Sequence, residues 1–402
     1  MNNKKNILFV EYCPDLKGGG AQRVFLNILK TVNQADYKIF SAFPLYKKGD
    51  LADEIPEYVT TFNYDSKSPD KTGRKILAYL EFLLYIPIIV FQNCCKLKWN
   101  SIEVVYCHSI ISGFHFALAK IFVNFKLVYH EHNMASQRPK MFVWRLMFDF
   151  VNSRSDKIIA ISHGVANELA DYGCDREKIV VVHNGIELQA IKDVNHLVAK
   201  GYQRLGLDSS NKTLLVGMIG HFRPWKGQAL FVESYHTACV FNDDIHYVIV
   251  GGIHDDAYYE QVQQYILQHD LSDKVTITGH QDNIPELLSC MDIIVVPSVP
   301  EPFGLVVLEA MMMAKPVVAF NIGGPAEIIR AGQTGVLVDD VASVSLGEAI
   351  GSLLNDSELR RVMGCEGRNL LEKQFTCQVQ VDHVETIIND LCEELSIKKR
   401  SV

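Results

Sequence analysis

The chain has 402 residues, a length that favours two domains over one. Hydrophobic residues make up 48% of it and charged residues 21%, which is ordinary globular composition and argues against long disordered regions. The formal net charge of −8 argues against a general nucleic-acid binder, because such a surface needs concentrated lysine and arginine to replace phosphate counterions.

Ten cysteines are spread along the chain, no two of them in C-x-x-C spacing, and most stand inside apolar runs. This pattern is typical of reduced, buried thiols and not of a disulfide framework or a zinc site. The first ten residues contain basic residues but an apolar run shorter than a signal peptide needs. We therefore expect a cytoplasmic protein.

In the first half, short apolar runs alternate with amphipathic segments. The first run is followed by the glycine loop 18–20 and by a helical stretch at 21–30. A turn signal, His-Asn-Gly at 183–185, ends this half. The strands expected before it are 7–10, 104–107, 126–130, 157–161 and 179–182.

The same alternation restarts after a more polar stretch, 186–210, which we expect to hold the hinge. Apolar strands of four to six residues separated by helices indicate parallel sheets that are covered on both faces. Two such series, each with a glycine loop after its first strand, predict an α/β fold of two Rossmann-like domains. The strands expected in the second series are 214–219, 247–250, 275–278, 293–296 and 316–320.

One segment departs from this pattern. Residues 82–91 form an unbroken apolar run that contains Pro87, with basic residues on both sides and Trp99 beyond. The run is too short to span a bilayer, which needs about 20 residues. Two interpretations remain: a buried helix with polar ends, or a helix lying in the membrane interface.

The most informative run of the second half is 300–310, where two carboxylates flank a transition from loop to helix. Pro302 suits the start of a helix, and Gly304 allows close approach of a ligand to the backbone. Free amides at a helix start bind phosphate. Glu301 lies outside the expected helix and Glu309 two turns inside it, and carboxylates of this kind accept hydrogen bonds from sugar hydroxyls.

This E-x7-E pattern with P-F-G resembles the signature of glycosyltransferase family 4, which comprises retaining nucleotide-sugar glycosyltransferases with the GT-B fold. Other motifs of the family follow in order, and their agreement carries more weight than a single glycine loop. After Gly19-Gly20-Ala21, the first of these motifs, this chain has Gln22 where the family usually has glutamate. These motifs are Gly19-Gly20-Ala21, Asn184-Gly185-Ile186, the loop 220–227, Gly323-Gly324-Pro325-Ala326-Glu327 and Thr334-Gly335.

The resemblance implies two Rossmann-like domains facing a central cleft: an acceptor-binding domain at 1–185 and a donor-binding domain at 186–375. A helix within 376–402 would cross back to the first domain. It further implies metal-independent transfer, without a cofactor, from a UDP- or GDP-sugar to a glycan or lipid-linked acceptor. The setting that it implies is bacterial cell-surface polysaccharide synthesis, with peripheral membrane contact through 82–99 as a further possibility.

The resemblance also assigns site residues. One departure is His221, which stands where the family commonly has arginine, with Arg223 two positions later. The residues expected to act in catalysis are Arg223, Lys226, Glu301 and His132. Those expected to bind the donor are Gly19, Gly20, Phe303, Gly304, Leu305, Glu309, His221 and Gly279. Those expected to contact the acceptor or the sugar are His130, His108 and Asn133.

Several rival interpretations remain open at this point. His130 and His132 could instead form a metal pair that needs a third ligand, or could be hydrogen-bonded structural residues. A GT-B epimerase or phosphorylase is the nearest enzymatic rival, and a non-catalytic partner subunit is the rival from another class. A dehydrogenase is weaker, because no complete G-x-G-x-x-G follows the first strand of either half.

Overall fold

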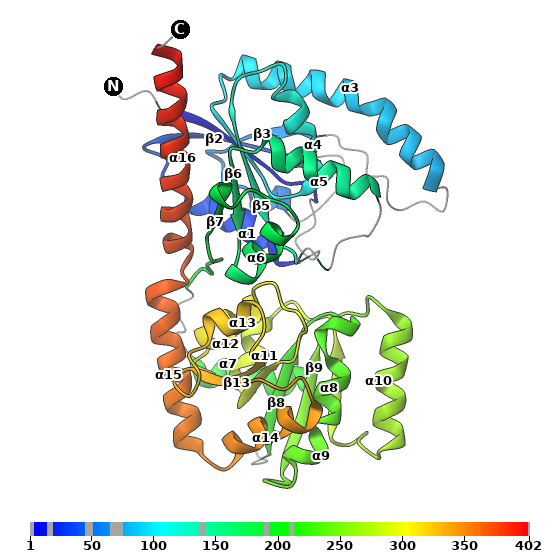
Figure 1. The fold of residues 1–402 in the computed structure, drawn as a ribbon. Helices are drawn as coiled ribbons and strands as arrows, with labels where there is room; N and C mark the ends of the chain where they lie inside the picture. The colour runs from blue at the N-terminus through cyan, green and yellow to red at the C-terminus, as the bar shows by residue number, and fades with distance from the viewer. Residues whose placement is uncertain are drawn as a thin grey trace. The chain divides into compact units, whose positions relative to one another are not determined.

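The computed structural model describes residues 4–13, 19–44, 51–64, 75–134, 136, 142–188, 193–208 and 213–400. The chain divides into two compact units (Figure 1). The N-terminal unit comprises Met1–Gly185 together with Cys377–Val402, and the C-terminal unit comprises Ile186–Thr376. Each unit is built on a parallel sheet, so the predicted α/β fold of two Rossmann-like halves is confirmed.

The sheet of the N-terminal unit has the strand order β3-β2-β1-β4-β5-β6-β7. The order reverses beside β1, so the carboxyl ends of β1 and β4 flank the topological switch point, where open α/β sheets bind ligands. The strands are β1 (Lys5–Val10), β2 (Tyr37–Phe43), β3 (Thr60–Asn63), β4 (Val104–Cys107), β5 (Lys126–Glu131), β6 (Lys157–Ala160) and β7 (Ile179–Val181).

Helices cover both faces of this sheet (Figure 1). The last helix packs against α1 and against β4 and β5, which places the end of the chain in the unit where the chain begins. The helices are α1 (Gly20–Thr31), α2 (Leu51–Glu54), α3 (Lys75–Trp99), α4 (Ile110–Ala119), α5 (Phe142–Arg154), α6 (His163–Asp171), η3 (Arg176–Lys178) and α16 (Cys377–Arg400).

The sheet of the C-terminal unit has the order β10-β9-β8-β11-β12-β13, with its switch point between β8 and β11. Its strands are β8 (Leu214–Ile219), β9 (Ile245–Val250), β10 (Val275–Gly279), β11 (Ile293–Val296), β12 (Val317–Phe320) and β13 (Gly335–Val338). Its helices are α7 (Val194–Leu205), η4 (Pro224–Lys226), α8 (Gln228–Glu233), α9 (Tyr235–Ala238), α10 (Asp256–Gln268), α11 (Ile284–Cys290), α12 (Leu305–Met312), α13 (Gly324–Ile328), α14 (Ser343–Leu354) and α15 (Ser357–Gln374).

The stretch expected to hold the hinge is largely helical where the structure describes it. Helix α7 occupies its centre and packs against α11, with Arg204 paired to Glu286. Gly201 makes the close packing possible, because a side chain there would collide with the Glu286 carbonyl and with Cys290. The polar composition of 186–210 therefore reflects a half-exposed helix of the C-terminal unit.

The segment 82–91, which could have been a buried helix, is exposed on one side of helix α3. The helix runs continuously through Pro87, and Leu84, Ile88 and Phe91 on one side of it are 74%, 50% and 70% exposed. The opposite side, with Ile89 and Val90, packs into the core. Within the described residues, no helix combines the length and apolarity that a bilayer crossing requires.

Candidate functional site

The loop after β8 carries the predicted cations of the C-terminal unit. Lys226 ends the short helix η4, and its Nζ donates to Glu301 Oε2 at 2.6 Å while lying 4.3 Å from the ring centroid of Trp225. The next residue, Gly227, has a φ of 79°, and a side chain there would collide with the Pro297 carbonyl. The loop thus packs directly on the chain that leaves β11.

Two glycines support the segment that carries Glu301. The Gly324 amide donates to the Glu301 carbonyl at 2.9 Å. A side chain at Gly324 would overlap the backbone of Phe303, and one at Gly323 would overlap the Glu301 carbonyl. The G-G pair of the sequence motif therefore serves to let two backbone segments touch, which fixes the position of Glu301.

Helix α12 begins later than the sequence predicts. Pro302 lies in the preceding bend, and Gly304, with a φ of 93°, is the residue before the first turn at Leu305. Glu309 is consequently little more than one turn inside the helix, not two. Phe303 is buried, whereas Glu309 is partly exposed.

Histidines surround the predicted phosphate-binding loop. The His221 ring stacks on His254 with centroids 4.0 Å apart and lies parallel to His280 at 6.4 Å. Arg223 Nη2 is 3.3 Å from His254 Nδ1. Burial, followed by His254, His280, Lys226 and Arg223, lowers the pKa of His221 to about 4, so this ring is neutral at pH 7.

Sequence reasoning missed His254 and His280. His254 follows the end of β9 after Gly251, Gly252 and Ile253, and His280 directly follows Gly279 at the end of β10. That position at the carboxyl edge of a parallel sheet is the signal that could have identified them. Gly279, predicted to bind the donor, directly precedes His280 and has a φ of 71°.

A second histidine cluster lies at the carboxyl edge of the N-terminal sheet. His108 follows β4, while His130 and His132 lie at the end of β5, and all three were predicted as site residues. His108 Nδ1 is 3.0 Å from His132 Nε2, and His130 Nδ1 is 3.0 Å from the Tyr106 hydroxyl. Burial lowers the pKa of His108 and His130 well below the usual value, and that of His132 to about 3.

Asn133 stands apart from these rings. Its backbone N–H donates to Glu131 Oε1 at 2.9 Å, and Glu131 Oε2 accepts from the Tyr129 hydroxyl at 2.6 Å. Asn133 is exposed, and it follows His132 directly in the chain, at the margin of the histidine cluster.

The glycine loop after β1 meets a buried acid. Gly18 lies outside the described residues, whereas Gly19 is the N-cap of α1 and Gly20 is its first residue. Gln22, where the family usually has glutamate, hydrogen-bonds the side chain of Glu11, and burial raises the pKa of Glu11 to about 7. A glutamate at position 22 would place a second carboxylate against this one. Gln22 avoids that pairing of two carboxylates.

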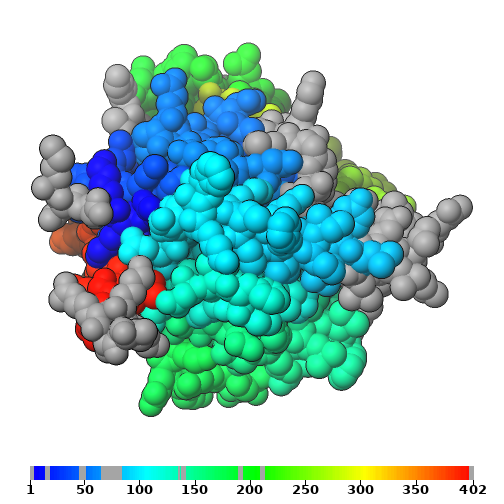
Figure 2. Space-filling model, turned by 90° about the horizontal axis from the view of Figure 1, so that it is seen from above, coloured from blue at the N-terminus to red at the C-terminus, as the bar shows by residue number. Residues whose placement is uncertain are grey.

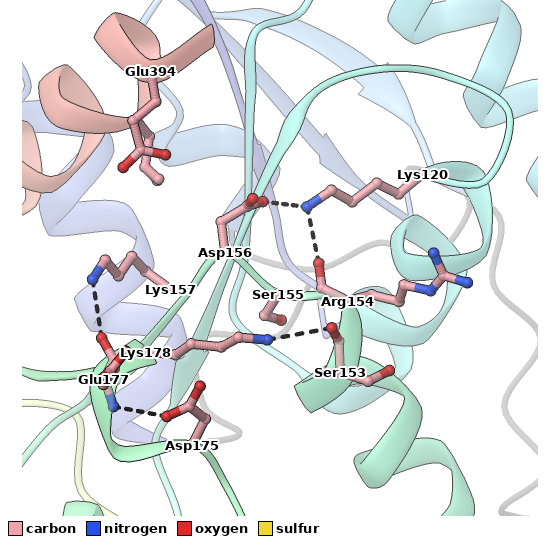
Figure 3. A pocket seen from close by; sticks show the side chains of 11 residues that line it. Lys120, Ser153, Arg154, Ser155, Asp156, Lys157, Asp175, Glu177, Lys178 and Glu394 are labelled. Atoms are coloured by element: carbon pink, nitrogen blue, oxygen red, sulfur yellow. Dashed lines mark hydrogen bonds and ion pairs between the residues drawn. The ribbon is translucent and has the colours of Figure 1, made fainter. Parts of the chain in front are cut away.

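A further hollow of about 520 Å³ lies at the opposite, amino-terminal end of β6 (Figure 3). Its lysines are engaged with neighbours: Lys120 pairs with Asp156, Lys157 Nζ donates to the Glu177 carbonyl at 3.1 Å, and Lys178 Nζ to the Ser153 carbonyl at 3.3 Å. These contacts occupy the ammonium groups of all three lysines, although only Lys120 is paired with a carboxylate here. This hollow contains none of the predicted site residues.

Two family models match the chain. The model described as Glycosyltransferase Family 4 matches residues 18–190, and the model described as Glycosyl transferases group 1 matches residues 203–370. The first covers most of the N-terminal unit and the second most of the C-terminal unit.

Individual proteins are also similar in sequence to this chain. The chain is 31% identical to N-acetyl-alpha-D-glucosaminyl L-malate synthase of Bacillus anthracis, over 60% of this chain and 61% of that protein. It is 24% identical to the capsular polysaccharide biosynthesis glycosyltransferase CapM of Staphylococcus aureus, over 63% and 67%. The matched part thus spans about three fifths to two thirds of these relatives' lengths.

Among solved structures, that of Anabaena HepE in complex with UDP-glucose superimposes with a TM-score of 0.78 at 21% identity, covering 96% of this chain and 99% of that one. At this level of identity, the structural similarity is evidence for the fold alone. The evidence for family membership is the two family models, which together match most of both units. The chain belongs to glycosyltransferase family 4 and has the GT-B fold.

Proposed function

We propose that the protein is a retaining glycosyltransferase that moves a sugar from a UDP- or GDP-sugar to a glycan or lipid-linked glycan in bacterial cell-surface polysaccharide synthesis. The observation that carries the proposal is the Lys226–Glu301 pair, held by glycine contacts at the carboxyl edge of the C-terminal sheet. Ligands of open α/β sheets bind at this edge. The relationship to CapM supports the setting.

In this proposal the diphosphate of the donor lies against the loop after β8. Lys226 and Arg223, together with the free amides at the start of α12, stabilise the charge that develops on the leaving phosphate. The His221 ring serves as a hydrogen-bond donor. Glu301 holds sugar hydroxyls and Glu309 the ribose, since carboxylates accept bonds from vicinal hydroxyls. The two cations supply the positive charge, so transfer proceeds without a metal ion.

The N-terminal unit provides the acceptor side and one contact to the sugar, His132, with His108 and His130 beside it. The amides of Gly19 and Gly20 add donors for the phosphates. The acceptor hydroxyl attacks the anomeric carbon on the face of the leaving group. The bond from that carbon to the β-phosphate oxygen breaks, and this oxygen takes the hydroxyl proton. Configuration is therefore retained.

Helix α3 carries the proposed peripheral membrane contact. Leu84, Ile88 and Phe91 repeat at helical spacing on its exposed side, and Trp99 at its end is 91% exposed beside the exposed Lys98. An apolar stripe ending in tryptophan and lysine fits a helix that lies in the interface of an anionic bilayer. In Figure 2 the blue and cyan atoms of this region form the surface that faces the viewer.

The donor site is tested by thermal unfolding of the full chain with UDP, GDP, ADP and their sugars. A ligand at a hundredfold excess over its Kd stabilises by about 2.7 kcal/mol. We expect a shift with one nucleotide class, lost in Lys226→Ala and Glu309→Ala but kept in Lys373→Ala, which removes a lysine elsewhere in the same unit. A folded wild type that responds to no nucleotide contradicts the proposal.

The membrane contact is tested by flotation with vesicles of phosphatidylglycerol and phosphatidylcholine at low salt. Wild type should float, and the variant Leu84→Ser/Ile88→Ser/Phe91→Ser should remain in the dense fraction. Val240→Ser is the control, because Val240 is 82% exposed on the other unit. Equal recovery of the triple variant and wild type in the floating fraction would refute the assignment of this face.

A further inference from the structure

Strands β8 and β9 keep their parallel register beyond the residues where they end. Within the sheet Leu214 pairs with Ile245, and after both strands have ended Phe222 still pairs with Ile253 in the same register. The Phe222 N–H donates to the Gly252 carbonyl at 2.9 Å. The pairing of the two strands therefore continues into the two loops at the carboxyl edge of the sheet.

This register decides which side chains lie together in the loops. Successive residues of an extended segment point to opposite faces, and Phe222 is buried in the core of the unit, so His221 and Arg223 point away from the core. The same register places Arg223 beside His254, and His221 beside Gly252. A Cβ at Gly252 would lie 3.4 Å from His221 Nδ1, so the glycine leaves room for the His254 ring to stack on that of His221.

The contact between Arg223 and His254 has a defined direction. Arg223 Nη2 lies 3.3 Å from His254 Nδ1. A guanidinium has only donors, so Nδ1 must accept and the ring proton must be on Nε2. Burial, followed by Arg223 and His280, lowers the pKa of His254, which keeps the ring in this neutral, accepting form at pH 7. The hydrogen bond thus restricts an exposed arginine that would otherwise sample many rotamers.

The restricted guanidinium lies next to the loop that the donor diphosphate would occupy. His221 stands where the family commonly has arginine, and it supplies no charge while its ring is neutral. Burial lowers the pKa of His221 to about 4, and His254, His280, Lys226 and Arg223 add to this effect, so both cations lie near its ring. Arg223 is therefore placed to supply the positive charge that position 221 lacks.

We propose that His254 is a positioning residue for donor binding, which holds the Arg223 guanidinium toward the diphosphate in place of an arginine at 221. This role rests on the proposed function, which places the diphosphate at the loop after β8. A guanidinium that is oriented before the ligand arrives loses less conformational freedom on binding, so its contact with phosphate contributes more to affinity.

The hydrogen bond itself is tested without nucleotide, by proton–nitrogen NMR of the full chain labelled with ¹⁵N-histidine. The His254 resonances are assigned by their loss in His254→Asn. We expect the Nε2–H tautomer, with Nδ1 shifted by the hydrogen bond that it accepts. Arg223→Ala should move the Nδ1 resonance toward that of a non-bonded acceptor nitrogen. An Nδ1–H tautomer, or an Nδ1 resonance unchanged in Arg223→Ala, would overturn the proposal.

The role in binding is tested by calorimetry with UDP and GDP. Arg223→Ala should weaken binding of the preferred nucleotide at least about tenfold, as expected for loss of a charged hydrogen bond. His254→Ala should weaken it about threefold or more, because Arg223 loses its orientation. His254→Asn should restore binding to within about twofold of wild type, since its carbonyl oxygen can accept near the Nδ1 position.

A double variant separates a positioning role from direct contact with the ligand. If His254 acts only through Arg223, Arg223→Ala/His254→Ala should bind no more weakly than Arg223→Ala. The matched control is His269→Ala, because His269 is likewise exposed and stacked on a ring, that of Tyr265 at 4.1 Å. This control should bind as wild type does.

The outcomes distinguish failure of this role from failure of the proposed function. Additive losses in the double variant would overturn the proposal, because they would show that His254 contacts the ligand itself. Equal weakening by His254→Asn and His254→Ala would overturn it too, and so would nucleotide binding unaffected by His254→Ala. A folded wild type with the expected His254 resonances that binds neither UDP nor GDP would refute the proposed function, and this role with it.

Discussion

Lys226 and Glu301, 75 residues apart in the chain, form an ion pair of 2.6 Å between the loop after β8 and the loop after β11. Both side chains are largely buried, at 19% and 9% exposure. Removing one partner of such a pair leaves the other charge poorly solvated. The pair therefore orients two groups that the proposed reaction needs, and each depends on the other for its position.

Replacing either partner should slow the reaction by about a hundredfold to a thousandfold, the usual effect of losing one group that stabilises transition-state charge. Glu301→Gln is the sharper variant because it keeps the shape and removes the charge. The measurement is the rate of nucleoside diphosphate release from the donor. Glu358→Gln, at an exposed position on α15, should change nothing. A Glu301→Gln variant with more than a tenth of the wild-type rate would show that the carboxylate is dispensable.

The glycine pair at the start of α13 should be intolerant of a methyl group for a local steric reason. In Gly324→Ala the new Cβ would overlap backbone atoms of Phe303, which cannot move aside as a side chain can. We expect lower stability and at least tenfold weaker donor binding, because the segment with Glu301 is displaced. The control is Gly332→Ala, where φ is 75° but no atom lies within 4 Å, so the cost is strain alone, about 1 kcal/mol. Similar effects of both variants on donor binding would contradict the packing argument.

Donor binding should take up a proton. His221 has its pKa lowered to about 4 by burial and by the nearby His254, His280, Lys226 and Arg223. A bound diphosphate opposes this field, so the pKa of His221 rises on binding and affinity increases as the pH falls toward the pKa of the free protein, about 4. Calorimetry in two buffers of different ionisation enthalpy measures the uptake. His221→Gln should reduce it, and an unchanged uptake in that variant would assign the proton elsewhere.

Acid should destabilise the N-terminal unit through His115. Burial lowers the pKa of this histidine from 6.5 to about 4, so the unfolded chain binds a proton that the folded chain does not. Stability is therefore complete above about pH 6.5 and falls as the pH drops toward 4, by roughly 3 kcal/mol for this group. In His115→Gln the urea midpoint should fall less than in wild type between about pH 7.5 and about pH 5. An equal fall would exclude His115 as the source.

The alternation of apolar runs sufficed to predict the α/β fold, because strands buried on both faces are continuous apolar segments. Strands β2, β3 and β13 were missed. The run at β2 is as apolar as the others, whereas β3 and β13 are short edge strands that lack a long apolar run. Helix α7 was missed because a half-exposed helix is polar in composition.

Motif spacing predicted the candidate residues, but it could not predict how their side chains are arranged in space. Nothing in the sequence indicates that Gly324 touches Phe303, that Lys226 pairs with Glu301, or that His254 stacks on His221, since each contact joins segments brought together by the parallel sheet. The exposure of Leu84 and Phe91 depends likewise on which side of α3 packs on the core. Such contacts follow from tertiary packing, which local patterns do not specify.

The central claim is that the C-terminal unit binds the diphosphate of a nucleotide sugar through Lys226. The most direct measurement is the Kd of UDP and of GDP for the full-length wild type, for Lys226→Ala and for Lys373→Ala, by isothermal titration calorimetry. We predict binding of one of the two nucleotides at one site per chain, weakened at least tenfold, or about 1.4 kcal/mol, in Lys226→Ala and unchanged in Lys373→Ala. Equal affinity of Lys226→Ala and wild type, or no binding of either nucleotide by folded wild type, would contradict the account.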